Sequence, residues 1–223
     1  MKNSDLEKVY IDTNILLTYA LGRKRNLKEE DFTAVLKLFN DAVEGKYKIV
    51  ISNFLLAETL HALRSIVTES TFKEQGKGLS RERLLKMANS EEFLGQVARE
   101  SQKYFREIVD KLIRDTEHFS IEEPGQTYSG DMFRNCLDLI ASSFGTFRVY
   151  SYYCSLCNEQ MSCHKCKSDS KIVYKSLNAP DLMHILISIN LGCKRFFTMD
   201  KYFDIIRNKI PIDIQIIGIN SNS

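Results

Sequence analysis

The sequence lacks any long hydrophobic run. No apolar stretch among its 223 residues approaches the roughly 18 residues needed to cross a bilayer. The opening residues, MKNSDLEK, contain no apolar core of a signal peptide. These absences argue against a membrane partner and lead us to expect a soluble, cytoplasmic protein. In that reducing compartment, the six cysteines are expected to be thiols or metal ligands rather than disulfides.

The chain also lacks a strong excess of either charge. It has 31 basic and 29 acidic residues, for a formal net charge of +2. This balance argues against a protein that coats nucleic acid by bulk charge, but it leaves room for a local basic patch beside an acidic pocket. The sequence contains no glycine-rich phosphate loop and no GxSxG nucleophile elbow. It has no internal repeat, and its hydrophobic fraction of 43% is enough for a sizeable core.

Short β-rich runs alternate with helical patterns along the chain. The runs expected to form strands cover residues 8–11, 48–51, 119–121, 195–199 and 212–217. The helical patterns cover residues 15–21, 32–43, 53 to about 67, 81–114, 132–144 and a segment that begins near 180. The polar residues 68–80 are expected to form a loop. This order predicts an α/β fold in which helices cover a parallel sheet.

Four acidic residues lie where a strand ends or a helix begins. Asp12 directly follows the first strand, and Asp200 follows the strand at 195–199. Glu58 lies on the helix that leaves the second strand, and Asp181 opens a helix just after a proline. Since open parallel α/β sheets bind ligands beyond the carboxyl ends of their strands, all four side chains can meet at one edge of the sheet.

Each of these acids also has an ordinary structural interpretation. Asp181 can complement a helix dipole, Asp200 can cap a short helix at 202–208, and Glu58 can be a solvated helix residue. Asp12 is harder to explain in this way, because an aspartate that closes a buried strand has no obvious structural role. The four residues together therefore favour a shared site over four separate roles.

Four carboxylates brought together would repel one another. Two like charges about 4 Å apart repel by about 4 kcal/mol at an effective dielectric constant of about 20. Such groups raise one another's pKa unless a cation neutralises them. Oxygen ligands without histidine favour Mg²⁺ or Mn²⁺, and these ions activate water and clamp a phosphodiester during in-line displacement. The acids therefore predict a divalent-metal site that hydrolyses phosphodiester bonds.

The ordered set of motifs resembles the PIN-domain ribonucleases, whose compact members are the VapC-type toxins. The resemblance rests on DTN at 12–14, the glutamate after the second strand, the aspartate at a helix start and TMD at 198–200. It covers residues 8–63 and 177–218. It implies a three-layer α/β/α fold with a parallel sheet of order 3-2-1-4-5, and Mg²⁺- or Mn²⁺-dependent cleavage of RNA.

The resemblance also assigns roles to individual residues. The catalytic and metal-binding positions are matched by Asp12, Glu58, Asp181 and Asp200. The supporting polar positions are matched by Asn14 and Thr198. Asp204, one turn beyond Asp200, is either an auxiliary acid or an ordinary helix residue, and we favour the ordinary role. His61 and His184 lie on apolar helices and are expected to be packed or capped rather than catalytic.

The chain is longer than a compact toxin needs. We take residues 1–223 as a single PIN-like nuclease domain that carries a helical insertion at 68–116 and a Cys-rich, zinc-knuckle insertion at 150–176. Both a toxin with an antitoxin partner and a larger RNA-processing nuclease with a regulatory partner are therefore open. The family also suggests a homodimer.

Two CxxC pairs lie within the Cys-rich insertion. The four cysteines are Cys154, Cys157, Cys163 and Cys166. Four thiolates are enough for a closed tetrahedral Zn²⁺ site of structural type, and we favour it over redox thiols, disulfides or an iron–sulfur cluster. His164 can replace one cysteine but is better explained as an exposed neighbour. Cys136 and Cys193 lie in apolar stretches and are expected to be buried thiols.

Lysines in and after the cysteine cluster are candidates for contacts with RNA phosphates. They are Lys165, Lys167, Lys171 and Lys175. An equally weighted alternative is a charged, solvated loop. Two other functions are also open for the whole chain. One is a catalytically inactive RNA-binding or scaffold module that uses the zinc knuckle, and the other is a small-molecule phosphohydrolase, which the absence of a DxD pair after the first strand disfavours.

Overall fold

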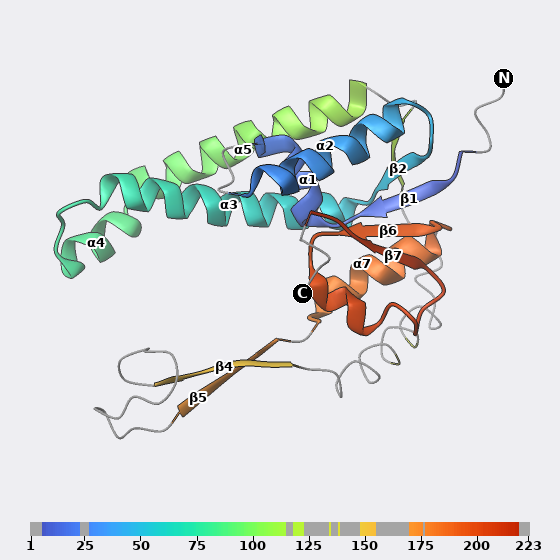
Figure 1. Cartoon of the computed structure of the whole chain (residues 1–223). Coiled ribbons are helices and arrows are strands. Elements are labelled where there is room, and N and C mark those ends of the chain that lie inside the picture. The colour runs from blue at the N-terminus through green and yellow to red at the C-terminus, as the bar shows by residue number, and fades with distance from the viewer. Residues whose placement is uncertain are drawn as a thin grey trace.

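The computed structural model (Figure 1) describes residues 6–22, 27–114, 118–122, 134, 138, 148–154, 170–175 and 177–218. The helix expected at 132–144 lies outside these residues, apart from the helical Arg134 and Asp138. Within the described part of the chain, no helix has the length and apolarity needed to cross a membrane.

Five parallel strands form the central sheet. They are β1 (Lys8–Ile11), β2 (Lys48–Ile51), β3 (Phe119–Ile121), β6 (Arg195–Thr198) and β7 (Asp213–Ile216). Their order across the sheet is β3-β2-β1-β6-β7. Counted within this sheet alone, β6 and β7 are the fourth and fifth strands, so the order is 3-2-1-4-5. The predicted α/β class, parallel sheet and strand order are therefore confirmed. β4 (Arg148–Cys154) and β5 (Ser170–Lys175) form a separate antiparallel pair, which the sequence patterns did not predict.

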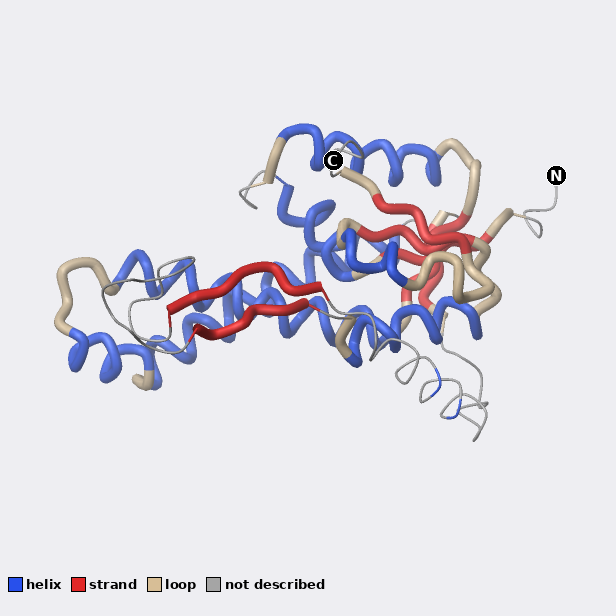
Figure 2. The backbone as a smooth tube through the Cα atoms, turned by 60° about the horizontal axis from the view of Figure 1, so that its bottom comes forward, coloured by secondary structure: helices blue, strands red, loops and turns tan. Residues whose placement is uncertain are grey.

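Seven helical segments accompany the strands in the described residues. They are α1 (Thr13–Leu21), α2 (Glu29–Val43), α3 (Asn53–Gln75), α4 (Arg81–Ala88), α5 (Glu91–Arg114), α7 (Ala179–Asn190) and the 3-10 helix η3 (Lys201–Ile205). Figure 1 shows α1, α2, α3 and α5 gathered together, with α7 beside β6 and β7. In Figure 2, as in Figure 1, α3 and α5 run side by side and extend with α4 away from the sheet.

Helix α3 is longer than its sequence pattern suggested. Ser52 caps it by accepting the backbone N–H of Leu55 at 3.1 Å. The expected loop at 68–80 is wrong for residues 68–75, which continue the helix to Gln75. Thr71 is 3% exposed there, and Val67 packs against residues of α5 in a second hydrophobic cluster. Burial against α5 therefore decides the structure of a stretch that looks polar by itself.

The helix expected over 81–114 is interrupted. α4 ends at Ala88 with Asn89 as its C-cap, and Ser90 accepts the backbone N–H of Phe93 at 3.2 Å and so starts α5. Beyond this break, the buried face of α5 brings Ile108 and Leu112 into the main core beside the sheet. α5 thus joins the core at one end and supports the extended part of α3 at the other.

Candidate active site

A pocket of about 410 Å³ lies where the chain leaves the carboxyl ends of β1 and β6. Residues from α1, α3, α7 and η3 line it. Among them are Thr13, Asn14, Glu58, His61, Asp181 and Asp200. The structure therefore brings three of the four predicted acids and the predicted Asn14 together in one pocket.

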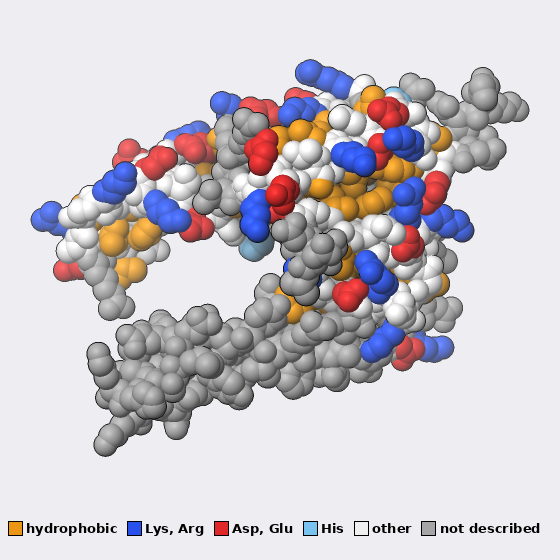
Figure 3. All heavy atoms as spheres, in the orientation of Figure 1, with side chains coloured by type: hydrophobic (Ala, Val, Ile, Leu, Met, Phe, Trp, Pro, Cys, Tyr) orange, Lys and Arg blue, Asp and Glu red, His pale blue; other side chains and the backbone are white. Residues whose placement is uncertain are grey.

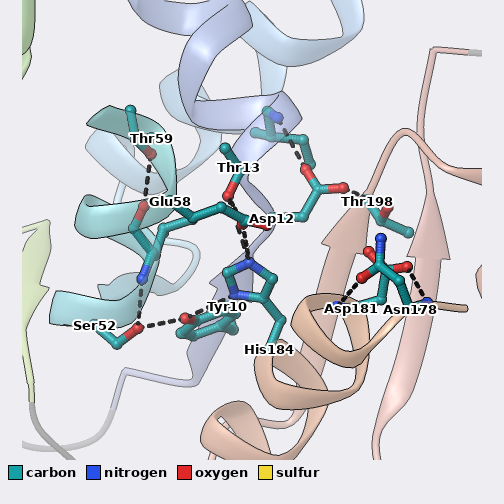
Figure 4. Close-up of polar contacts among 12 residues, drawn as sticks. Tyr10, Asp12, Thr13, Ser52, Glu58, Thr59, Asn178, Asp181, His184 and Thr198 are labelled. Carbon is teal, nitrogen blue, oxygen red and sulfur yellow. Dashed lines mark hydrogen bonds and ion pairs between the residues drawn. The ribbon is translucent and has the colours of Figure 1, made fainter. Parts of the chain in front are cut away.

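Asp12, the fourth predicted acid, does not line this pocket. Asp12 is 5% exposed, and side-chain and backbone groups around it donate hydrogen bonds to its carboxylate. Oδ1 accepts the backbone N–H of Ile15 at 2.9 Å and so caps α1, whereas Oδ2 accepts the hydroxyl of Thr198 at 2.6 Å. Burial raises the pKa of Asp12 above its ordinary value, against the opposing effect of these hydrogen bonds. Asp12 directly precedes Thr13, which does line the pocket, and Figure 4 shows both residues at the start of α1.

Glu58 enters the pocket from α3. Its Oε2 accepts hydrogen bonds from the hydroxyl of Thr13 and from Nε2 of His184, which lies 2.5 Å away (Figure 4). Burial acts to raise the pKa of Glu58, but the hydrogen bonds from His184 and Thr13 together lower it below the ordinary value. Glu58 is therefore held as an ionised, acceptor-only group.

Asp181 lies in the first turn of α7 and forms a capping box with Asn178. Oδ2 of Asp181 accepts the backbone N–H of Asn178 at 2.8 Å, and the side chain of Asn178 accepts the backbone N–H of Asp181 at 2.9 Å. Burial raises the pKa of Asp181 to about 6, helped by the nearby charges of Asp200 and Glu58. The structural role expected for Asp181 is thus present, together with a carboxylate in a negative environment.

Asp200 and Thr198 connect the pocket with the buried Asp12. Oδ1 of Asp200 caps η3 by accepting the backbone N–H of Tyr202 at 2.9 Å, as the capping interpretation expected. The backbone N–H of Asp200 donates to the hydroxyl oxygen of Thr198 at 2.9 Å. Thr198, which is fully buried, therefore contacts both acids, and this contact agrees with the supporting role expected for it.

Asp204 does not line the pocket. It is exposed, and its carboxylate lies 3.3 Å from the guanidinium of Arg207, one turn further along the chain. The expectation of an ordinary helix residue agrees with this position.

Three side chains at the site were not expected there. Thr13 contacts Glu58, and His184, although 2% exposed and packed as expected, donates to the same carboxylate. His61 is exposed and lines the pocket, so the expectation that it is packed is wrong. Spacing could have found both histidines, because His61 and His184 each lie three residues after a predicted acid and thus on the same helix face.

The cysteine cluster lies largely outside the described residues. Cys154 ends β4, where it is the register partner of Ser170 at the start of β5. The cluster residues outside the described part are Cys157, Cys163, Cys166, Lys165 and Lys167. Lys171 and Lys175 belong to β5. Cys193 is 6% exposed, and burial raises the pKa of its thiol to about 12, which confirms a buried core thiol, whereas Cys136 is not among the described residues.

The chemistry of the pocket suits a hard cation. Its three carboxylates and the carboxamide of Asn14 are oxygen donors of the kind that Mg²⁺ and Mn²⁺ prefer. Burial is the main cause of the raised pKa of Asp181, and the nearby charges of Asp200 and Glu58 add to it, so a cation bound among these carboxylates would favour the ionised form. The described residues contain no ready-made group of three or more His, Cys, Asp or Glu side chains around one metal position. The donor types therefore fit, and the carboxylates would have to draw closer to share an ion.

Comparison of the chain with protein-family models, with curated proteins and with solved structures found no match.

Proposed function

We propose that this chain is a metal-dependent endoribonuclease of the PIN type that hydrolyses RNA phosphodiester bonds with Mg²⁺ or Mn²⁺. The observation that carries the proposal is the meeting of Glu58, Asp181 and Asp200 in one pocket at the carboxyl ends of the strands. The raised pKa of Asp181 is in accord with it: burial is the main cause, and the charges of Asp200 and Glu58 raise this pKa further, an effect that a bound cation would offset.

Each residue has a defined task in this proposal. Asp181 and Asp200 would hold the ion, with Asn14 beside them at the pocket wall. Asp12, which directly precedes the pocket residue Thr13, would join them. Glu58, held ionised by Thr13 and His184, would complete the site or orient the attacking water. A bound Mg²⁺ or Mn²⁺ would stabilise the negative charge that develops on the phosphate and the leaving oxygen.

The proposal extends to the parts of the chain beyond this pocket. We infer a three-layer α/β/α core with the helical insertion at 68–116 and a zinc knuckle at 150–176, in which Zn²⁺ is structural. The lysines of the knuckle would contact RNA. A homodimer and an antitoxin or regulatory partner belong to the same proposal, as does a cytoplasmic location. Figure 3 shows acidic and basic side chains interleaved over α3 and α5, a surface that by itself favours no single class of partner.

Mapping of cleavage products on total RNA tests the proposal. The intact protein is incubated with Mn²⁺ beside Asp12→Asn and Asp204→Asn, and the new RNA ends are sequenced. We expect cleavage by the intact protein and by the exposed Asp204→Asn control, and none by Asp12→Asn. Full cleavage by Asp12→Asn, or cleavage that persists in a metal chelator, contradicts the proposal.

A second candidate is an RNA-binding module without catalysis. The observation that favours it is the state of Asp12, whose two oxygens both serve as hydrogen-bond acceptors within the fold. Binding of RNA by the intact protein, with no Mn²⁺ bound at the pocket and no cleavage, would support this alternative.

A further inference from the structure

A buried hydrogen-bond chain runs beneath Glu58 and ends on its carboxylate. Ser52 Oγ lies 2.6 Å from the hydroxyl of Tyr10, and that hydroxyl lies 3.3 Å from Nδ1 of His184. Nε2 of His184 lies 2.5 Å from Oε2 of Glu58. The series of hydrogen bonds thus runs from the cap of α3 to β1, then to α7, and back to α3 (Figure 4).

The donors and acceptors along this series of hydrogen bonds show which group donates at each step. An ionised carboxylate only accepts hydrogen bonds, so Nε2 of His184 carries a hydrogen atom and donates to Glu58. In the neutral ring Nδ1 is then an acceptor, which the hydroxyl of Tyr10 satisfies. The hydroxyl oxygen of Tyr10 in turn accepts from Ser52, whose own oxygen accepts the backbone N–H of Leu55. Every polar atom along the chain is satisfied.

Packing fixes the imidazole in this orientation. His184 is 2% exposed, and its ring lies 5.0 Å from that of Phe54 in an edge-on arrangement and 5.8 Å from that of Tyr10. Tyr10 is itself fully buried in the central strand and stacks on Phe196. Because neither ring can turn without disturbing the core, the Nε2–H of His184 stays directed at the Glu58 carboxylate at the wall of the pocket, with the hydroxyl oxygen of Thr13 3.4 Å from Nε2 beside it.

We propose that His184 is a positioning residue that holds the carboxylate of Glu58 toward the pocket for metal binding. This inference rests on the proposed function, because it takes Glu58 as part of a metal site. His184 itself does not line the pocket, so it acts through Glu58. Hydrogen-bond partners behind a metal ligand fix its orientation, and their loss typically lowers metal affinity by about 10–100-fold.

The side-chain amides of glutamine and asparagine separate positioning from packing. In His184→Gln the amide nitrogen can occupy the place of Nε2 and donate to Glu58. In His184→Asn the amide lies near the place of Nδ1, so it can contact Tyr10 but cannot reach Glu58. Both variants replace a buried ring by a smaller polar group, so a purely structural role predicts similar losses of thermal stability and similar Mn²⁺ binding for the two.

The experiment measures Mn²⁺ affinity by isothermal titration calorimetry on the full chain, without RNA. We expect His184→Asn to weaken Mn²⁺ binding by about 10–100-fold, and His184→Gln to stay close to the intact protein. In a Glu58→Gln background, His184→Asn should cause no further loss. Equal affinities of the two His184 variants, or a full additional loss in the Glu58→Gln background, would overturn the inference.

If the His184 variants do not fold, NMR on proteins that keep His184 still tests the inference. The Nε2–H proton of His184 should give a low-field NMR resonance that shifts upfield in Glu58→Ala, whose altered side chain is partly exposed. An unchanged resonance overturns the inference. A chain that binds Mn²⁺ with the expected His184 dependence but leaves RNA intact contradicts only the proposed ribonuclease activity.

Discussion

The hydroxyl group of Thr198 lies 2.6 Å from Oδ2 of Asp12, so the last residue of β6 is bonded to the residue that follows β1. The same hydroxyl oxygen accepts the backbone N–H of Asp200. One buried side chain therefore sets the orientation of an acid on one strand and the backbone of an acid on the next. These contacts give Thr198 an effect on stability that its small size does not suggest.

Thr198→Val tests this effect because it keeps the shape of the side chain and removes the hydroxyl. The variant leaves Oδ2 of buried Asp12 without its donor, which is expected to cost about 1–3 kcal/mol of the free energy of unfolding. Urea denaturation measures the loss. Thr33→Val is the control, since its hydroxyl is exposed on α2 and bonds only within that helix. Equal stabilities of the two variants would contradict the role given to Thr198.

Asp181 gives the free energy of unfolding a defined pH dependence. Its folded-state pKa of about 6 lies above the ordinary value of 3.8, so folding favours the protonated form. The stabilising contribution of this group is full below pH 3.8 and is lost as the pH rises through about 6. Intact protein should therefore lose stability relative to Asp181→Asn across that interval.

Chemical denaturation at several pH values compares the two proteins. Addition of Mg²⁺ near neutral pH should stabilise the intact protein and not the variant, because a bound cation removes the penalty on the ionised form. Parallel pH profiles without the metal would show that Asp181 is not the group that titrates.

The two CxxC pairs predict about one Zn²⁺ per chain, by the count of four thiolates. Elemental analysis of the purified protein should find it, and Cys154→Ser/Cys157→Ser should lose it. Cys193→Ala is the matched control, because Cys193 is a buried thiol outside the cluster and its loss should leave the zinc in place. Intact disulfides without metal would refute the assignment.

His61 lies at the pocket wall with its ring exposed, where it can donate a hydrogen bond to a phosphate oxygen of RNA. Hydrogen bonds to charged groups contribute about 1.5–3 kcal/mol, so His61→Ala is expected to lower kcat/KM for RNA cleavage by about tenfold or more. Ser65→Ala, one turn further along the exposed side of α3, should change the rate little. Equal kcat/KM values for the two variants would show that His61 has no part in RNA cleavage.

The extended part of α3 allows a direct test of the revised helix boundary. Thr71→Pro removes a backbone hydrogen bond and introduces a clash within the helix, which is expected to cost about 3 kcal/mol or more. Thr71→Ala keeps the helix and should cost much less. The difference between the two in urea denaturation reports on the helix alone. If Thr71→Pro is as stable as Thr71→Ala, residues 68–75 form the loop that the sequence pattern suggested and not a helix.

The strands were predictable because a strand that is buried on both faces has apolar residues at successive positions, which appear in the sequence as short, continuous apolar runs. The runs at 8–11 and 48–51 coincide with β1 and β2, and the acid after β1 marks the edge of the sheet. The carboxyl ends of parallel strands lie at one edge, so the gathering of Glu58, Asp181 and Asp200 followed from strand order alone.

What escaped prediction depends on contacts between distant parts of the chain. The spacing of His184 from Asp181 could have placed it near the site, but its contact with Glu58, 126 positions away on another helix, follows from no periodicity. The polar stretch after Val67 is helical because α5 packs against it, which its own composition does not reveal. The hydrogen bond between Thr198 and Asp12 likewise joins residues 186 positions apart, so the local sequence does not reveal it.

Because β1 lies between β2 and β6 in the sheet, the pocket can form only after all three strands have been synthesised. β2 follows β1 closely in the chain, but β6 starts only at Arg195. Until it emerges, β1 exposes an unpaired hydrogen-bonding edge, and neither Thr198 nor Asp200 is present. A chain whose translation stops before β6 therefore carries Asp12, Glu58 and Asp181 but not Asp200, so its pocket is incomplete.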